Sequence, residues 1–269
     1  MISFDAYLQI LEAHGGTDVD YLRRHWPRFC ATKRIFEAEW RGGKPRVLDV
    51  GAHWLHQALL FAVDGYRVTA ADLAATIEAP NVVSLARACG IDLVCVRDLS
   101  APDAFGSLSP GSVDVVILGE VLEHVTFNPV SLWQALYRVL AEGGRIVLTT
   151  PNYYALTRRH LHEFRAWRGW GSGITVDEIL RTPTYGHHWK EFSRREVVRY
   201  FELLSPDFLI SRTLYVEDEP VEAVPFARGL AHAIRKSFPP LRERLHVEID
   251  LPKKTHGIVI APGSVADGH

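Results

Sequence analysis

The sequence has few of the residues that mark disulfide-rich, zinc-knuckle or membrane proteins. It contains three cysteines and one methionine, and Cys30, Cys89 and Cys95 lack the Cys-x-x-Cys spacing of a zinc knuckle. An odd number of scattered cysteines favours a reducing compartment, so we expect a cytoplasmic protein. The first residues carry no basic segment, and no apolar run approaches the roughly 18 residues of a membrane-spanning helix. We therefore expect neither a signal peptide nor a membrane span.

A charge excess of either sign is missing as well. The 30 Lys and Arg residues nearly balance the 32 Asp and Glu residues, which leaves a net charge of −2. General electrostatic binding of nucleic acid needs a basic surface, so we expect no nucleic-acid partner. The composition is otherwise that of an ordinary globular protein of 269 residues, and its 13 histidines are the unusual count. The sequence leaves the oligomeric state open.

The chain divides into a helical leader and a longer segment in which strands and helices alternate. Helical periodicity over residues 7–40 breaks at Gly15-Gly16 and resumes after Thr17-Asp18, a pair suited to N-capping. We therefore predict a helical leader or cap at 1–42. The main domain would cover 43–269, with lid insertions at about 152–190 and 217–251.

Short apolar runs between helical segments predict the strands of the main domain. Five come early, at 46–51, 66–72, 91–96, 113–118 and 145–150. Two more are expected at 208–216 and 256–261, the last completing the sheet edge. This alternation predicts an α/β fold built on a doubly wound, mostly parallel seven-stranded sheet.

Acidic residues follow four of the predicted strands. Asp49 ends the first strand just before Gly51, and Asp72 ends the second strand. Asp98 and Glu120 follow the third and fourth strands. Ligands of an open parallel sheet bind beyond the carboxyl ends of the strands. An acid at the end of the second strand is placed to accept hydrogen bonds from ribose hydroxyls.

Four segments carry a family resemblance: VLDVG at 47–51, VTAADL at 68–73, VDVVILGEVLEH at 113–124 and GGRIVLTTPN at 143–152. Each is weak alone, but the four occur in order and at family-like spacing. Together they resemble the class I S-adenosylmethionine-dependent methyltransferases, in the branch of ubiquinone-type and glycan- or natural-product-tailoring enzymes. The resemblance implies a Rossmann-like methyltransferase fold and S-adenosylmethionine as the cofactor.

The resemblance also implies a role for each matching residue. Asp49 would lie under the methionine part, Asp72 would hold the ribose hydroxyls, and Glu120 would line the methyl side. Asp98 would accept the adenine amino group with Leu99 beside the ring, although a simple turn acid is the alternative. A sulfonium cation with an ammonium group suits such carboxylates. The implied cofactor-binding residues are Asp49, Gly51, Asp72, Leu73, Asp98, Leu99, Gly119 and Glu120.

The loop after the first strand departs from the family pattern. The second and third glycine positions of that pattern hold His53 and Leu55. A nucleotide pyrophosphate needs a glycine-lined approach, so a dinucleotide oxidoreductase is disfavoured. The same departure keeps open a catalytically silent methyltransferase-like binding domain.

Histidines gather in segments expected beside the methyl acceptor. The string HHWKEFS at 187–193 resembles a His-x-x-x-Phe-Ser segment of related methyltransferases, which places His187 or His188 near the acceptor. We predict one of them as general base for a hydroxyl, with His124 as a further proton-transfer candidate.

The same histidines permit a different class of function. With nearby glutamates they could hold a divalent metal in a hydrolase or isomerase. A lid whose His and Trp residues pack over the pocket is the favoured alternative, so we assign no metal-binding residue. The candidate ligands weighed are His160, His162, Glu163, His187, His188 and Glu191.

Arginines and aromatic residues in the first insertion bear on the acceptor. Such a cluster suits an anionic, ring-containing acceptor, and an exposed helix with solvated arginines is the alternative. We expect O-methylation of a small-molecule, sugar or glycan-linked acceptor. The residues concerned are Arg158, Arg159, Arg165, Arg168, Tyr153, Tyr154, Trp167 and Trp170.

Overall fold

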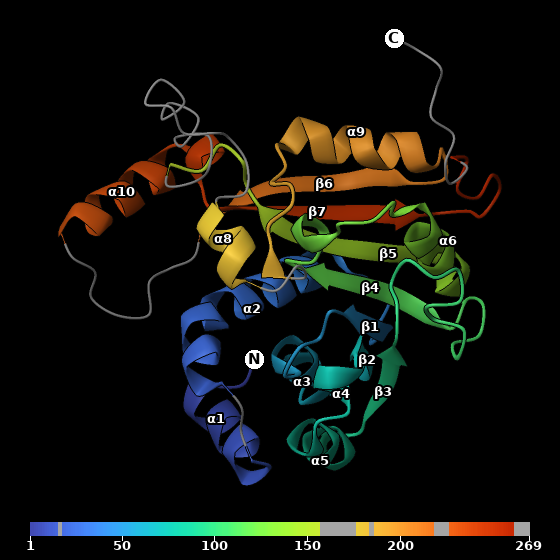
Figure 1. The fold of residues 1–269 in the computed structure, drawn as a ribbon, viewed down its shortest axis with the longest axis horizontal. Coiled ribbons are helices and arrows are strands. Elements are labelled where there is room, and N and C mark those ends of the chain that lie inside the picture. The colour runs from blue at the N-terminus through green and yellow to red at the C-terminus, as the bar shows by residue number, and fades with distance from the viewer. Residues whose placement is uncertain (16–17, 157–175, 183–185, 218–225, 261–269) are drawn as a thin grey trace.

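A seven-stranded sheet forms the centre of the computed structural model, which describes residues 1–15, 18–156, 176–182, 186–217 and 226–260 (Figure 1). The strands lie in the order β3-β2-β1-β4-β5-β7-β6. The first five pair in parallel, and β7 runs antiparallel to both β5 and β6. This confirms the predicted α/β, mostly parallel seven-stranded sheet. The strands are β1 Arg46–Val50, β2 Arg67–Leu73, β3 Ile91–Val96, β4 Val113–Gly119, β5 Leu140–Pro151, β6 Leu209–Val216 and β7 Arg244–Leu251.

The prediction of the last strand is wrong. Residues 256–260 form no strand, and the seventh strand is β7, which lies within the stretch predicted as the second insertion and pairs between β5 and β6 instead of at the sheet edge. Charged residues make the β7 segment look too polar for a strand in the sequence. In the structure, Glu248 and Asp250 of β7 pair with Arg145 of β5 at 2.6 Å each. The backbone N–H groups of residues 255–257 donate to the carboxylate of Asp207, which satisfies them outside any sheet.

Helices cover both faces of the sheet, as a doubly wound fold requires. Side chains alternate along β4, so Val115 and Ile117 face one core while Val116 and Leu118 face the other. The first core includes the leader helices, α3 and α5, and the second includes α6 and α9. The helices are α1 Phe4–Ala13, α2 Val19–Glu39, α3 His56–Ala62, α4 Ala74–Ile77, α5 Pro80–Cys89, η1 Leu122–His124, α6 Val130–Val139, α8 Val176–Arg181, α9 Arg194–Leu204, α10 Phe226–Ser237 and η4 Pro239–Leu241.

Local sequence signals account for several helix ends. Asp18 caps α2 by accepting a hydrogen bond from the Tyr21 N–H at 3.0 Å. Ser193 and Glu196 form a capping box at the start of α9. The leader helices pack onto the sheet and share its first core. One direct contact is the hydrogen bond that the Tyr7 hydroxyl donates to the carbonyl of His56 at 2.7 Å.

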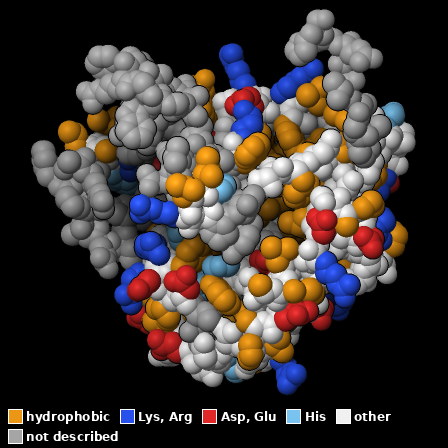
Figure 2. Space-filling model, in the orientation of Figure 1, with side chains coloured by type: hydrophobic (Ala, Val, Ile, Leu, Met, Phe, Trp, Pro, Cys, Tyr) orange, Lys and Arg blue, Asp and Glu red, His pale blue; other side chains and the backbone are white. Residues whose placement is uncertain are grey.

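The surface agrees with the balanced composition. Acidic and basic side chains of the described residues are interspersed over the face shown in Figure 2. Within the described part of the chain, no helix combines the length and apolarity that crossing a bilayer requires.

Candidate active site

A small cavity lies where the carboxyl ends of the central strands meet α2. Its volume is about 40 Å³. Strand ends and the following loops supply one wall, and the leader helix α2 supplies the other. The lining residues are Tyr21, Arg28, Phe29, Thr32, Asp49, Gly51, Ala52, His53, His56, Gln57, Gly119 and Thr149. Three of the predicted cofactor residues, Asp49, Gly51 and Gly119, therefore line one cavity.

Contacts between loops hold the cavity wall in place. Gly51 has φ +74°, and a Cβ added there would lie 2.6 Å from Cγ2 of Val121 in the loop after β4. Only glycine permits this close approach at a left-handed position. The Asp72 carboxylate accepts the backbone N–H groups of His53 and Leu73, both at 2.6 Å. A carboxylate has about four lone-pair sites, so Asp72 keeps the capacity to accept ribose hydroxyls.

Three residues without glycine's freedom also adopt left-handed backbone at this site. His53, Leu55 and Glu120 have φ values of 49°, 65° and 58°. The loop thus has left-handed backbone at both positions where the family pattern has glycine, at a cost of about 1–2 kcal/mol per residue. Burial of Leu55 and a ring contact between His53 and Tyr21 at 5.3 Å help to hold these conformations. Backbone strain of this kind concentrates at functional sites.

Two poorly solvated carboxyl groups lie here, Asp49 in the cavity lining and Glu120 directly after the lining residue Gly119. Burial, reinforced by the nearby charge of Asp72, raises the pKa of Asp49 to about 8. Oδ2 of Asp49 and Oε1 of Glu120 are buried and have no hydrogen-bond partner within the described structure. Buried acceptors without partners are costly, so the pair is suited to a cationic ligand that supplies donors.

The leader helix contributes a cation that the sequence analysis did not assign to the site. Arg28 is buried, and its guanidinium lies 3.9 Å from Glu120 Oε2 and donates to the Tyr21 hydroxyl at 2.8 Å. It also lies over the ring of Phe29, 4.9 Å from the centroid. Tyr21, Arg28 and Thr32 recur at seven- and four-residue spacing, which places them on one helix face. In the sequence, the available signal for Arg28 was its spacing from Tyr21 and Thr32, which places an arginine on the same helix face as these two residues.

The remaining predicted cofactor residues do not line the cavity. Asp98 is exposed and accepts both the backbone N–H and the hydroxyl of Ser100, at 2.8 and 2.7 Å. These hydrogen bonds lower its pKa and make it a turn residue. Leu73 is half-buried at the end of β2, and Leu99 is partly buried and packs against the second core. The adenine-binding role of Asp98 and Leu99 stays a prediction.

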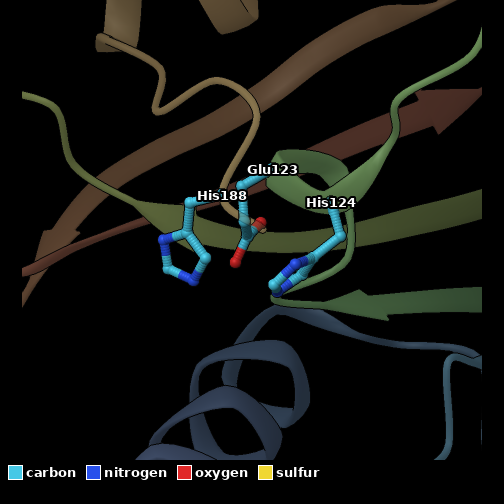
Figure 3. Close-up of side chains that lie close together, drawn as sticks. All are labelled: Glu123, His124 and His188. Atoms are coloured by element: carbon cyan, nitrogen blue, oxygen red, sulfur yellow. The ribbon is translucent and has the colours of Figure 1, made fainter. Parts of the chain in front are cut away.

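Two of the predicted catalytic histidines, His124 and His188, lie together after the end of β4, whose last residue Gly119 lines the cavity. The rings of His124 and His188 meet edge to face with centroids 4.8 Å apart, and Glu123 lies between them (Figure 3). The backbone N–H of Trp189 donates to the carbonyl of Glu123 at 2.7 Å, which fixes the loop carrying His188. The ring of His187 instead contacts the carbonyl of Thr182 at 2.8 Å.

The electrostatics of this cluster follow from its burial. Burial and the neighbouring His188 lower the pKa of His124, so its ring is neutral at physiological pH. Burial and the nearby Glu120 raise the pKa of Glu123 well above its ordinary value. His160, His162, Glu163 and the arginine–tryptophan cluster of the first insertion lie outside the described residues; Tyr153 and Tyr154 lie within them.

Comparison with known proteins decides the family. The family model described as "Methyltransferase domain" matches residues 22–203. The chain belongs to this family. It is a class I S-adenosylmethionine-dependent methyltransferase, and S-adenosylmethionine is the cofactor that the family implies. Among curated proteins, no match is found.

Solved structures share the fold of this methyltransferase at low sequence identity. A chain in the complex of the Haloferax volcanii Trm112 methyltransferase activator with the putative methyltransferase has 16% identity and a TM-score of 0.56, with 87% of our chain and 92% of that chain covered. An S-adenosylmethionine-dependent methyltransferase from Mesorhizobium loti has 17% identity and a TM-score of 0.54, covering 84% and 97%. A geranyl diphosphate C-methyltransferase from Streptomyces coelicolor has 14% identity and a TM-score of 0.53, covering 82% and 75%.

The observed donors and acceptors fit the cofactor of the methyltransferase. S-adenosylmethionine carries a sulfonium, an ammonium and a carboxylate in its methionine part. Asp49 and Glu120 offer buried acceptor atoms without partners, and Arg28 supplies a buried cation at the same cavity. Once Asp49 is ionised, the charges of these side chains complement the charges of the methionine part.

Proposed function

We propose that this methyltransferase transfers the methyl group to a hydroxyl of a small-molecule or carbohydrate acceptor. The observation that carries the proposal is the meeting of His124 and His188 after the end of β4. Gly119 and Thr149 line the cavity, and Thr150, the residue after Thr149, donates to Oε2 of Glu123 at 3.0 Å. Glu123 and His124 follow Gly119 closely in the chain. An acceptor hydroxyl at the cluster would thus lie next to the methyl side of the cofactor.

In this proposal the cofactor is bound by residues from β1, β2, α2 and the segment after β3. Asp49 receives the methionine ammonium at the end of β1, and Asp72 accepts the ribose hydroxyls at the end of β2. Arg28 of α2 pairs with the methionine carboxylate, a role its burial and its 3.9 Å distance from Glu120 support. Asp98, with Leu99, is kept as the proposed adenine contact.

The chemistry needs little beyond positioning. When bound, S-adenosylmethionine supplies a methyl group on a sulfonium, which is a good leaving group. The protein must align the acceptor oxygen with the methyl carbon and exclude water. The hydroxyl loses its proton as the new O–C bond forms, and the neutral ring of His124 or that of His188 is placed to accept it.

Calorimetry tests the cofactor site. S-adenosylmethionine and its demethylated product should both bind the wild type, and Asp72→Ala should abolish binding. Asp92→Ala removes an exposed acid from β3 and serves as the matched control, which should bind normally. If neither compound binds the wild type, the cofactor assignment is wrong.

The acceptor class needs a separate measurement. Release of demethylated cofactor should be screened with hydroxylated sugars, sugar phosphates and phenols. An active hydroxyl compound should become inactive when that oxygen already carries a methyl group. Transfer to an amine or a carbon instead of oxygen would contradict the proposed O-methylation.

A further inference from the structure

Glu123, His124 and His188 form a side-chain cluster with the composition of a metal site. One ligand atom from each residue lies within 4.8 Å of the other two. Two imidazoles and one carboxylate are the ligand types preferred by Zn²⁺, Mn²⁺ and Fe²⁺. Ligand atoms about 2.0–2.2 Å from one ion are roughly 3–4 Å apart, so a small side-chain rotation completes the geometry. Figure 3 shows the carboxylate of Glu123 directed between the two rings.

Each member of the cluster is oriented by a second group, as metal ligands usually are. Nδ1 of His188 lies 3.2 Å from Oε1 of the buried Glu191, and Nδ1 of His124 lies 3.1 Å from the carbonyl of His187. The Thr150 hydroxyl donates to Oε2 of Glu123 at 3.0 Å. Such outer contacts select the tautomer and aim the ring at an ion.

The carboxyl of Glu123 provides an independent indication. The residue is 0% exposed, and its Oε1 has no hydrogen-bond partner among the described residues. A fully buried carboxyl oxygen without a partner is costly unless a cation or donor satisfies it. A bound cation beside the two rings would remove that cost.

We propose that Glu123, His124 and His188 bind one divalent transition-metal ion at the acceptor side of the active site. Three protein ligands leave at least one coordination position for an exogenous oxygen. The role of the ion rests on the proposed function: it binds the acceptor hydroxyl and lowers its pKa. The proton then goes to solvent, the oxygen forms its bond to the methyl carbon, and the carbon–sulfur bond breaks. With the ion bound, the two rings act as its ligands, and this route replaces the proton transfer to a histidine ring that the proposed function describes for the ion-free site.

Metal titration tests the site without any acceptor. Chelator-treated, tag-free protein is titrated with Mn²⁺, Zn²⁺ and Co²⁺ in competition with a chromogenic chelator. The wild type should bind one ion per chain. Glu123→Gln and His188→Ala should lose this binding, and Glu191→Gln should weaken it by about 10–100-fold, the usual effect of removing an outer partner.

A matched control and a spectrum separate ligation from misfolding. His256→Ala removes a histidine that pairs with Asp207 at 2.8 Å and follows the end of β7, which pairs with the start of β5. The metal cluster lies at the other end of β5, so this variant should leave ion binding unchanged. Circular dichroism checks that each variant is folded. The Co²⁺ complex of the wild type should show ligand-field absorption that Glu123→Gln lacks. No stoichiometric ion in the wild type, or equal affinity in the ligand variants, would overturn the proposal.

Failure of the metal proposal can be distinguished from failure of the proposed function, because metal binding and cofactor binding are measured separately. Normal cofactor binding without metal binding would refute the metal site alone. Metal binding without cofactor binding would refute the cofactor site alone. Once an acceptor is known, chelation should abolish methyl transfer if the ion acts on the hydroxyl, and should leave it unchanged if a histidine is the base.

Discussion

Gly51 is required by the packing of the protein itself. Its close approach to Val121 predicts the effect of Gly51→Ala. A Cβ at this position would lie 2.6 Å from Cγ2 of Val121, at a φ of +74°. The left-handed backbone costs about 1–2 kcal/mol for a residue with a Cβ, and overpacking adds about 1–3 kcal/mol. Alanine also leaves the unfolded chain fewer conformations than glycine does, which offsets about 0.4–1 kcal/mol of this cost. We therefore expect Gly51→Ala to lower the free energy of unfolding by about 2–4 kcal/mol.

A double-mutant cycle separates the two contributions. Val121→Ala removes the clashing methyl, and the Val121 Cβ that remains is 3.9 Å from the new methyl group, an ordinary contact. The double variant should therefore be more stable than the sum of the single effects predicts, by about 1–3 kcal/mol. Urea unfolding at constant m value measures each free energy. Additivity within about 0.5 kcal/mol would refute the reasoning, because the cost would then come from the backbone alone.

Three further predictions follow from buried charges. Asp49, whose pKa is about 8, must lose its proton to pair with the cationic cofactor. Calorimetric affinity should thus rise by about tenfold per pH unit below pH 8 and level off above it, whereas Asp49→Asn should show no such rise. Burial opposes ionisation of Asp207, but hydrogen bonds from Tyr137 and others hold its pKa below the ordinary value. Its stabilisation, about 1.5–3 kcal/mol, should be present above pH about 4 and fade as the pH falls. Urea unfolding should show Asp207→Asn less stable than wild type at pH 7 and nearly equal to it at low pH. Lys33 is buried and pairs with Asp64, tying α2 to the segment after α3. Lys33→Ala should cost about 3 kcal/mol in thermal unfolding, and an undiminished melting temperature would contradict this account.

The sheet could be predicted wherever its signals are local. The apolar runs of β1 to β4 end in turn or acidic residues, and this pattern is visible in any short window of the sequence. β7 lacks such a signal because Glu248 and Asp250 interrupt it. Both pair with Arg145, which is more than a hundred residues away in the chain. The location of this strand therefore depends on a pairing that no local pattern contains.

The candidate site divides in the same way. The sequence by itself determined that Asp49, Gly51, Asp72 and Glu120 lie at one edge of the sheet, because parallel strands bring their carboxyl ends together. Only the tertiary structure decided that Arg28 reaches the same cavity from the leader.

The histidines required the tertiary structure as well. Sequence spacing placed His124 after the fourth strand and His187-His188 in a later segment, with no indication of which rings meet. The backbone contact between Trp189 and Glu123 brings His188 to His124, while the ring of His187 turns to Thr182. Strand-end acids are positioned by a regular, repeating backbone, which a sequence pattern reveals. Contacts between separate loops depend on how the whole chain packs, and for that reason the three-dimensional structure was needed to find them.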